Sequence, residues 1–537
     1  MTRFVRSPRR TVPLFIALTL TLFSLFTLLF SYTTPTSHPN FASNSELESE
    51  PIPVPHLDPL PPPGPLPPLR ELLYFLRAHP DDPIDPTIEV SSQSSIGSTP
   101  EEHNRNAIIR LHECLEKGTC KEKQSSIVLV GSMEFIGSAF LSWMGGEAIW
   151  ASSIIRALDH LGYTFLFSRR LDQTAIQYRV LGDYVKVVVV EPIKSFKCLE
   201  SAECTRTDTT QNTDSEKSIW DKGGIPAWKL FSFHFWGDSK NPLGPGWTMS
   251  PEPSIELQEE YFRKLFQGGE LDSIGYKRKR DATSSFLASI WPSKILVPKK
   301  QVIGPRGSDS NLGNTYIGYS IEEVCEKTPL IPREERQKQA YVFAKMSAFF
   351  FTEEFAWSNA IFQRARDELN VTLLAYTQST PNVPEPPSAL AHTSHLLPQT
   401  EFFSKVAHSK ILIGIGNPPL SPSPYDALCL GVPFLNPILS WNKDNPGDKI
   451  NWYTQQNGLK YVDAPYVYNV FRNDSDGFFH AIQSAMKNPI DRFIPDHMRK
   501  EAMWDRVERF VESDWRSRAS RLLEKRVRSG EGKLFVI

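Results

Sequence analysis

The stretch IGIGNPPLSPSPYDALCLGVPFLNP, residues 413–437, begins as a buried strand and ends as another. Between them stand a proline-rich loop and PYDALCLG, which has the pattern of a short helix. Gly414 and Gly416 lack a Cβ atom, so a phosphate or a sugar can approach the backbone there. The prolines fix the path of the loop and lower the entropy lost when a ligand binds. The stretch predicts either a rigid ligand-binding loop or an ordinary strand–helix connection.

The helix predicted in this stretch opens with Pro424 and carries Asp426 in its first turn. Ser421 and Ser423 stand between the prolines just before it. A helix N-terminus suits anions, and a carboxylate there can accept hydrogen bonds from the paired hydroxyls of a ribose. The alternative is that Asp426 only stabilises the helix start, by about 0.3–1 kcal/mol. The pattern alone leaves both interpretations open.

Short apolar runs alternate with helical segments on both sides of this stretch. The candidate strands are SSIVLVGS, YTFLFS and VKVVVVEP in the first half, and NTYIGYSIEE, AYVFAKMSAFF, VTLLAYTQ and HSKILIGIG in the second. The segment EAIWASSIIRALDHLG between them has apolar residues at helical spacing and ends at Gly162, a natural helix cap. This alternation predicts two doubly wound α/β halves with mostly parallel sheets, in which ligands bind at the carboxyl ends of the strands.

The N-terminal segment differs from the rest of the chain. Residues 12–32 carry no charge and follow the basic sequence MTRFVRSPRR, which predicts a transmembrane signal anchor with the remainder outside the cytoplasm. A cleaved signal peptide is the alternative, although SYTTPTS is a poor cleavage site. Residues 33–105 are rich in proline and serine and predict an extended stem. An anchor, a stem and a globular body are typical of a lumenal Golgi enzyme and also of a cell-surface receptor.

The length of 537 residues predicts more than one domain. The formal net charge of −2 gives no electrostatic reason to expect a nucleic-acid partner. The expected divisions are a cytoplasmic tail 1–11, the anchor 12–32, the stem 33–105, an N-terminal domain 106–310, a C-terminal domain 311–515 and a tail 516–537.

The cysteines and two asparagines agree with a lumenal location. The motifs CLEKGTC and CLESAEC have a spacing that can close small disulfide loops, and the absence of a C-x-x-C motif disfavours zinc. The pairing of all six cysteines cannot be read from the sequence. Asn370 and Asn473 stand in N-x-S/T acceptor triplets, which predict N-glycosylation.

Residues 413–437 resemble glycosyltransferase family 18, the N-acetylglucosaminyltransferase V type, which forms β1,6 branches on mannose of N-glycans. In that family a strand ending in glycine leads into a proline-rich loop, then Pro-x-Glu-Ala, a helix and an FLNP strand. The alignment needs no gap, and Asp426 stands where the family has glutamate. The segments LLPQTEFFSKVAHSKILIGIG and PYVYNV are also similar. The resemblance is weakest over residues 195–310, which leaves the acceptor site open.

The resemblance implies a GT-B fold and an inverting, metal-independent transfer from UDP-N-acetylglucosamine. Glu147, in the motif GGE, matches the family's catalytic base. Such a carboxylate takes the proton of the acceptor hydroxyl as it attacks the anomeric carbon; the alternative for Glu147 is a helix-start charge. Lys449 or Lys443 would neutralise the departing diphosphate. The residues implied in donor binding are Gly146, Gly414, Gly416, Ser421, Ser423, Pro424, Asp426 and Lys449.

The sequence also allows a metal-binding motif, a different donor sugar and a non-catalytic function. Asp474 and Asp476 form a D-x-D motif of the kind that holds a divalent metal in other transferases, although it overlaps a glycosylation triplet in a polar turn. An inverting GT-B transferase could use another nucleotide sugar. A non-catalytic, membrane-tethered glycan-binding protein is the alternative outside enzymes, and the presence of both Glu147 and Asp426 disfavours it.

Overall fold

The computed structural model describes residues 62–76, 97–143, 145–206, 223–235, 241–252 and 313–537. The predicted anchor, residues 12–32, lies outside them. Within the described part of the chain, no helix has both the length and the apolar character needed to cross a membrane.

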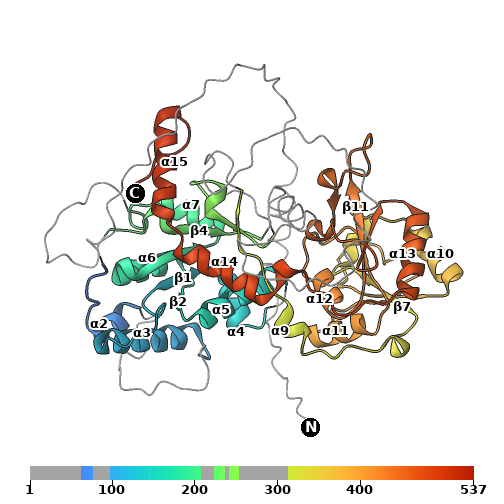
Figure 1. The fold of residues 1–537 in the computed structure, drawn as a ribbon, viewed down its shortest axis with the longest axis horizontal. Helices are drawn as coiled ribbons and strands as arrows, with labels where there is room; N and C mark the ends of the chain where they lie inside the picture. Colours follow the sequence, from blue (N-terminus) through green and yellow to red (C-terminus); the bar gives the residue numbers. More distant parts are fainter. Residues whose placement is uncertain (1–61, 77–96, 144, 207–222, 236–240, 253–312) are drawn as a thin grey trace, which may run out of the picture. The chain divides into compact units, whose positions relative to one another are not determined.

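The first half is built on a six-stranded sheet with the order β2-β1-β3-β4-β5-β6. Every pairing in this sheet is parallel, as the alternation of strands and helices predicted. Helix α3 contacts β2, α6 contacts β1, and α2 packs against α3 and α6, while α4 and α5 pack together (Figure 1). The elements are α2 (Leu69–Leu76), α3 (Pro100–Lys117), β1 (Ile127–Gly131), α4 (Met133–Phe140), α5 (Gly146–Leu161), β2 (Thr164–Phe167), α6 (Leu171–Leu181), β3 (Val185–Val190), α7 (Pro192–Glu200), β4 (Leu230–Phe233), β5 (Thr248–Ser250) and β6 (Thr315–Tyr316).

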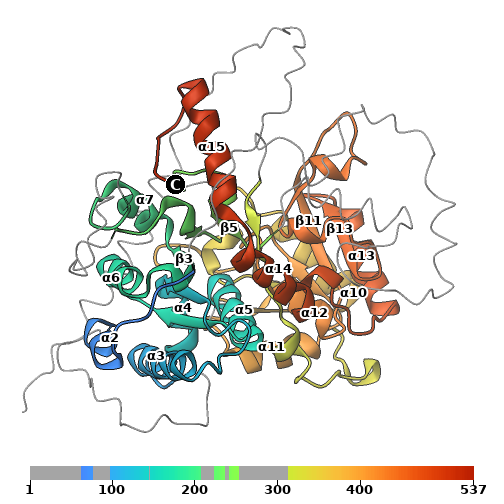
Figure 2. The ribbon, with the colours of Figure 1, turned by 60° about the vertical axis from the view of Figure 1, so that its left-hand side comes forward.

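The second half is built on a seven-stranded sheet with the order β12-β11-β10-β7-β8-β9, and β13 also pairs with β11. Only the β11–β12 pairing is antiparallel among these strands. Helices α10 and α13 lie side by side (Figures 1 and 2). The elements are α9 (Glu322–Cys325), β7 (Gln339–Phe343), α10 (Asn359–Leu369), β8 (Thr372–Tyr376), β9 (Ala391–Thr393), α11 (Gln399–Ala407), β10 (Leu412–Gly414), α12 (Ser423–Cys429), β11 (Phe434–Ser440), β12 (Tyr453–Thr454), β13 (Val467–Phe471), α13 (Ser475–Lys487), α14 (Lys500–Glu512) and α15 (Trp515–Ser529).

The predicted stem, residues 33–105, extends too far along the chain. Helix α2 lies within it, but Leu72, Leu73 and Leu76 are buried and the helix packs against α3 and α6 of the first half. The proline-rich composition of this stretch obscured the amphipathic pattern LRELLYFL, which buries one face of the helix.

The structure differs from the predicted division of the chain in two further places. NTYIGYSIEE, expected as a strand of the second half, supplies β6, which pairs with β5 in the first sheet. Helix α14 packs against α5 and β3 of the first half, and α15, in the predicted tail, contacts residues 227–229 (Figures 1 and 2). The ring of Phe231 lies 4.8 Å from Phe510 and 4.7 Å from Trp515, measured between centroids. The apolar faces of both helices are therefore buried on the first sheet.

Three disulfides join the six cysteines. Cys114–Cys120 and Cys198–Cys204 close two short loops, which confirms the prediction from spacing. The third, Cys325–Cys429, links residues 104 positions apart and joins α9 to α12.

Candidate active site

A cavity of about 640 Å³ lies between residues of the two sheets. Its volume is within the usual range of ligand sites, about 300–1,000 Å³. The first half contributes the start of α5, and the second half contributes the segments that follow β7, β9 and β10. These are carboxyl ends of parallel strands, where ligands bind in doubly wound sheets. The cavity is therefore where the predicted site residues of the two halves have to meet.

Glu147 lines this cavity from the first turn of α5. Its side chain is half-buried, and no hydrogen bond or ion pair to its carboxylate occurs within the described residues. The N-cap Gly145 has a φ of 150°, and a Cβ at Gly146 would lie 2.5 Å from the Phe235 ring. The two glycines thus allow the chain to enter the helix closely packed, with the carboxylate facing the cavity and unengaged.

A second carboxylate lies near Glu147. Burial, and then the negative charges of Glu147 and Glu191, raise the pKa of Glu134 to about 7. Glu134 stands in the first turn of α4, and the neighbouring Met133 amide donates to Glu191 Oε1 at 2.7 Å. Ser138 on the same helix donates to the Ala148 carbonyl at 2.9 Å. These contacts fix α4 against the start of α5, which carries Glu147.

Asp426 lines the cavity from α12 in the other half. It is 4 % exposed, and no hydrogen bond or ion pair to its carboxyl group occurs within the described residues. Burial alone raises the pKa of this carboxyl well above its usual range. Since buried polar groups are normally paired, a buried carboxyl group that faces a cavity without a partner indicates a ligand.

The proline-rich loop before α12 is held by two glutamines that the sequence analysis did not single out. Gln455 Oε1 accepts from the Gly416 amide at 2.9 Å, and Gln455 Nε2 donates to the Pro418 carbonyl at 3.2 Å. Gln456 Nε2 donates to the Ser421 carbonyl at 2.8 Å. Ser421 and Ser423, which also line the cavity, lie within 3.4 Å of one another. The loop is thus fixed by hydrogen bonds in addition to its prolines.

The structure gives Gly414 and Gly416 a packing role. A Cβ at Gly414 would lie 2.4 Å from Gln455 Oε1, and one at Gly416 would lie 2.0 Å from the Glu354 carbonyl oxygen. Gly416 also has a φ of 110°, which favours glycine. Both residues lie outside the cavity lining, which begins at Pro418 in this loop. Close approach of protein atoms, rather than of a ligand, requires glycine at these two positions.

The predicted lysines also lie outside the cavity lining. Lys449 Nζ is 2.6 Å from Asp463 Oδ1, and Lys443 Nζ lies over the Trp441 ring at 3.0 Å. The lysine that does line the cavity is Lys345, two residues after β7. Its side chain is exposed and has no ion-pair partner within the described residues. A charged residue directly after a buried strand is the signal that could have identified it.

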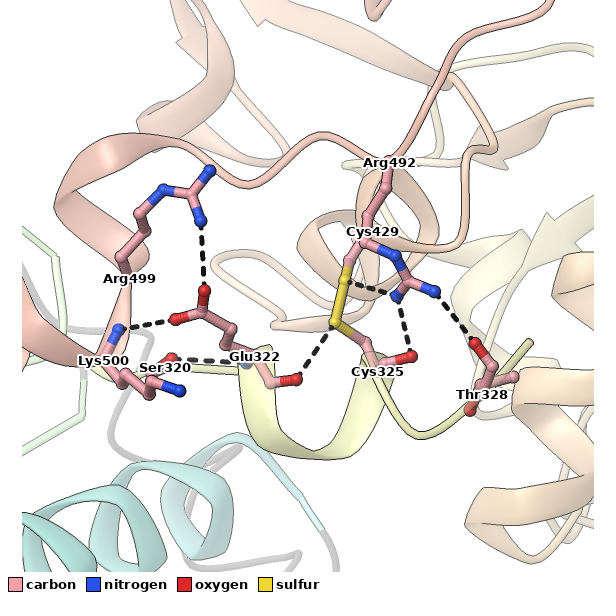
Figure 3. Close-up of a disulfide and its surroundings, with 8 residues drawn as sticks. All are labelled: Ser320, Glu322, Cys325, Thr328, Cys429, Arg492, Arg499 and Lys500. Atoms are coloured by element: carbon pink, nitrogen blue, oxygen red, sulfur yellow. Dashed lines mark hydrogen bonds and ion pairs between the residues drawn. A yellow bond between two sulfur atoms is a disulfide. The ribbon is translucent and has the colours of Figure 1, made fainter. Parts of the chain in front are cut away.

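Residues 320–325 connect the helices that carry the two carboxylates. Ser153 on α5 donates to the Ser320 carbonyl at 3.1 Å, while the Cys325–Cys429 disulfide joins α9 to α12 (Figure 3). Glu322 accepts from Arg499 Nη1 at 3.0 Å and from the amide of Lys500, the first residue of α14, at 2.9 Å. This segment therefore contacts α5, α12 and α14 together.

The guanidinium group of Arg492 lies beside the same disulfide. Its Nη1 donates to the Cys325 carbonyl at 2.8 Å and contacts Cys429 Sγ at 3.3 Å, and its Nη2 donates to the Thr328 carbonyl at 2.9 Å (Figure 3). The guanidinium group thus satisfies the carbonyls at the end of α9, which holds the last turn of that helix against α12.

The D-x-D motif and the glycosylation triplets lie elsewhere. Asp474 caps α13, since its Oδ1 accepts from the Gly477 amide at 2.9 Å. Among the described residues, no three His, Cys, Asp or Glu side chains gather as a metal site would require. Asn370 and Asn473 are both exposed and both have left-handed backbone conformations, with φ values of 48° and 62°.

The fold and the site are those of an α/β protein with two mostly parallel sheets and a cavity lined by residues of both halves. Residues 287–520 match the model of glycosyltransferase family 18. This match confirms, over that part of the chain, the resemblance predicted from the sequence.

The curated proteins that this chain resembles include N-acetylglucosaminyltransferases. Human alpha-1,6-mannosylglycoprotein 6-beta-N-acetylglucosaminyltransferase B is 25% identical over 257 residues, which cover 45% of this chain and 31% of the relative. Enzyme A of Cricetulus griseus is 22% identical over 212 residues, which cover 37% of this chain and 27% of the relative. The matched region thus spans less than a third of each relative. Among solved structures, trehalose-6-phosphate synthase OtsA is 9% identical, with a TM-score of 0.31, and covers 75% of this chain and 98% of its own.

Proposed function

We propose that the protein is an inverting GT-B glycosyltransferase that transfers N-acetylglucosamine from UDP-N-acetylglucosamine to a mannose of an N-glycan or related glycan, in β1,6 linkage. One observation carries the proposal: Glu147 and Asp426, on helices of different halves, line the same cavity. The match to glycosyltransferase family 18 and the names of the relatives support the substrate class.

The chemical step needs a single carboxylate. Glu147 takes the proton of the acceptor hydroxyl while the hydroxyl oxygen bonds to the anomeric carbon of the donor sugar. The bond from that carbon to the phosphate oxygen breaks on the opposite face, so the configuration inverts and UDP leaves with the bonding electrons. The unengaged carboxylate of Glu147 suits this role because no protein group has to be displaced before it accepts the proton.

The second half would hold the nucleotide. In this proposal Asp426 accepts hydrogen bonds from the ribose hydroxyls, which supplies the partner that the buried carboxyl group lacks in the protein. Lys345 is the better candidate to offset the charge of the diphosphate, because it lines the cavity while Lys449 is paired with Asp463. Ser421 and Ser423 are within the same lining and are expected to contact the donor.

The proposal includes a location. Residues 12–32 would anchor the protein in the Golgi membrane as a single-pass type II protein, and the part of the predicted stem before α2, residues 33–68, would link the anchor to the first half. Asn370 and Asn473 would then be exposed to the glycosylation machinery of the lumen. An alkaline wash followed by endoglycosidase treatment tests both points, and a soluble form starting just after residue 33 would contradict the anchor.

The test of the catalytic role is Glu147→Gln. Glutamine keeps the size of the side chain but cannot take a proton, and general-base catalysis contributes about 10²–10⁴-fold. We expect kcat to fall by that order with little change in the KM of donor or acceptor. Turnover within a few-fold of the parent would show that Glu147 is not the base.

The donor and the role of metal are tested on the parent protein. Hydrolysis of UDP- and GDP-sugars is compared in the presence of EDTA, and UDP-N-acetylglucosamine is expected to be consumed fastest. A preference for another sugar would keep the fold and the base but change the donor. Loss of activity in EDTA would overturn the metal-independent mechanism and direct attention to Asp474 and Asp476.

A further inference from the structure

We propose that the indole ring of Trp143 is a stacking surface for a hexose of the acceptor, next to the catalytic base. This inference rests on the transfer reaction proposed above and assigns the acceptor side of the cavity, where residues 195–310 gave no indication from the sequence.

The position of Trp143 is the first observation. It lines the same cavity as Glu147, from the connection between α4 and α5 in the first half. Its side chain is 43 % exposed, whereas tryptophan is on average highly buried. The candidate nucleotide residues Asp426 and Lys345 belong to the other half. An exposed apolar ring beside the base, in the half opposite the nucleotide residues, is placed for the acceptor.

The fold holds this ring in place by a specific arrangement, which is the second observation. The chain reverses after α4 at Ser142, which has a left-handed φ of 53°. The Trp143 amide then donates to the Gly137 carbonyl at 3.0 Å. A Cβ at Gly137 would lie 2.2 Å from the indole Cδ2 and Cε3 atoms. The ring therefore rests directly on the backbone of α4, in space that only glycine leaves free.

A glycine within a helix needs a reason, since glycine is among the least favourable residues there. A ring that rests on a glycine has one side covered and fixed, while the rest of its surface remains exposed to the cavity. A fixed ring of this kind can act as a rigid platform, unlike an exposed ring that has no packing contacts to hold it.

The chemistry of such a platform favours a sugar. The face of an aromatic ring is the negative end of its quadrupole. One face of a hexose such as mannose presents several C–H groups, which are apolar and carry a slight positive charge. Stacking these C–H groups on the indole would leave the hydroxyls at the sugar's edge free, one of them directed to the Glu147 carboxylate. A pyrimidine base is the other ligand that stacks on an aromatic ring, and the test separates the two.

Two variants remove the platform in different ways. Trp143→Ala deletes the ring, and Gly137→Ala keeps the ring but displaces it, because the added methyl group occupies its position. We expect both to raise the KM for an N-glycan core oligosaccharide ending in mannose by about 3- to 10-fold. Trp143→Phe should retain most of the affinity. Phe196→Ala, at an aromatic residue of similar exposure (42 %) outside the cavity lining, is the matched control.

Two readouts make the result decisive. Alanine at Gly137 improves the helix propensity of α4, so its thermal midpoint should not fall, which separates displacement of the ring from unfolding. The KM for the donor should stay within about twofold, since the platform serves the acceptor. An acceptor KM unchanged in both variants would overturn the proposal, and a rise confined to the donor would assign the ring to the nucleotide instead.

The inference can fail separately from the transfer reaction. Binding of the oligosaccharide to the Glu147→Gln protein, followed by calorimetry with and without Trp143→Ala, needs no turnover. Loss of oligosaccharide binding in the double variant supports the platform even if the parent transfers a different sugar. Equal binding by both proteins overturns it even if the parent is an active transferase.

Discussion

At the scale of single residues, the site depends on which titratable groups remain without a protein partner. Both acidic residues of the cavity lining, Glu147 and Asp426, have side chains without a partner within the described residues, and the side chain of Lys345 has no ion-pair partner there either. Lys449, by contrast, forms an ion pair with Asp463, with 2.6 Å between Nζ and Oδ1. An unpaired cation in a ligand cavity gains more from an anionic ligand than one already in an ion pair.

This difference leads to a prediction about the two lysines. Lys345→Met keeps the length of the side chain and removes its charge, so affinity for UDP should fall about tenfold or more, as expected for one lost charge-assisted hydrogen bond of about 1.5–3 kcal/mol. Lys449→Met is the matched variant and should change UDP affinity less than twofold. Calorimetric titration of UDP into both proteins makes the comparison. The reverse order of effects would return the diphosphate to Lys449.

At the scale of elements, one short helix connects the two helices that carry Glu147 and Asp426. Helix α9 is joined to α12 by Cys325–Cys429, and Ser320 just before it bonds to Ser153 on α5. The helix α12 has only seven residues, too few to be stable from its own hydrogen bonds. Helix α12 is therefore held by its packing, since six of its residues are buried, together with the disulfide and Arg492, which bonds to the end of α9.

Removal of this disulfide should affect both stability and donor binding. The bond closes a loop of 104 residues, and loss of a native disulfide typically costs about 2–5 kcal/mol. We expect the variant Cys325→Ala with Cys429→Ala to have a lower thermal midpoint and a weaker affinity for UDP. The matched variant replaces Cys198 and Cys204, which are six residues apart, and should leave UDP affinity unchanged. Equal effects from both pairs would show that α12 holds its position without the bond.

At the scale of the whole molecule, a buried acid joins the two halves. Glu252, just after β5, accepts from the Tyr425 hydroxyl on α12 at 3.4 Å and from Tyr319 at 3.3 Å. A Cβ at Gly458 would lie 2.5 Å from Glu252 Oε2, so glycine at that position allows the approach. Burial raises the pKa of Glu252 to about 8, an effect that the two tyrosine hydroxyls partly offset.

The raised pKa predicts how stability changes with pH. In the unfolded chain Glu252 loses its proton near pH 4.5, while the folded protein keeps it until about pH 8. The free energy of unfolding should therefore fall as pH rises through this window, by at most about 1.4 kcal/mol per pH unit. Glu252→Gln lacks this dependence, so its thermal midpoint should drop less than that of the parent between pH 5.5 and 8.5. Glu334→Gln, at an exposed position, is the control, and parallel profiles for Glu252→Gln and the parent would contradict the prediction.

The sequence predicted those parts of the fold that depend on local pattern. The strand at 127–131 is a continuous apolar run, the strand at 185–190 is apolar except for Lys186, and the parallel sheets follow from the alternation of such strands with helices. The position of β6 was wrong because a two-residue strand carries no periodicity that shows which sheet it joins. The amphipathic pattern of α14 shows that one face is buried but not on which sheet.

The site followed the same rule. Glu147 and Asp426 stand in helix-start motifs that local sequence reveals, and the structure brings both to one cavity. The pairing of Lys449 with Asp463 and the hydrogen bonds from Gln455 to the loop depend on contacts between segments that no local pattern encodes. The sequence did not indicate Trp143 as a site residue, because its exposed position depends on the contact between its ring and Gly137, six residues earlier.

The return of α14 and α15 to the first sheet has a consequence for biosynthesis. Domains generally fold in order as the ribosome releases them. Here the ring of Phe231 packs against Phe510 and Trp515, so it cannot be fully buried until these two residues have been synthesised. The half that is translated first is thus completed last, after the entire second half has emerged. A nascent chain cut short before α14 would expose the apolar surface of the first sheet while its second sheet could already be formed. Chaperones that bind exposed apolar surface would therefore bind the first half of this protein, although that half is synthesised first.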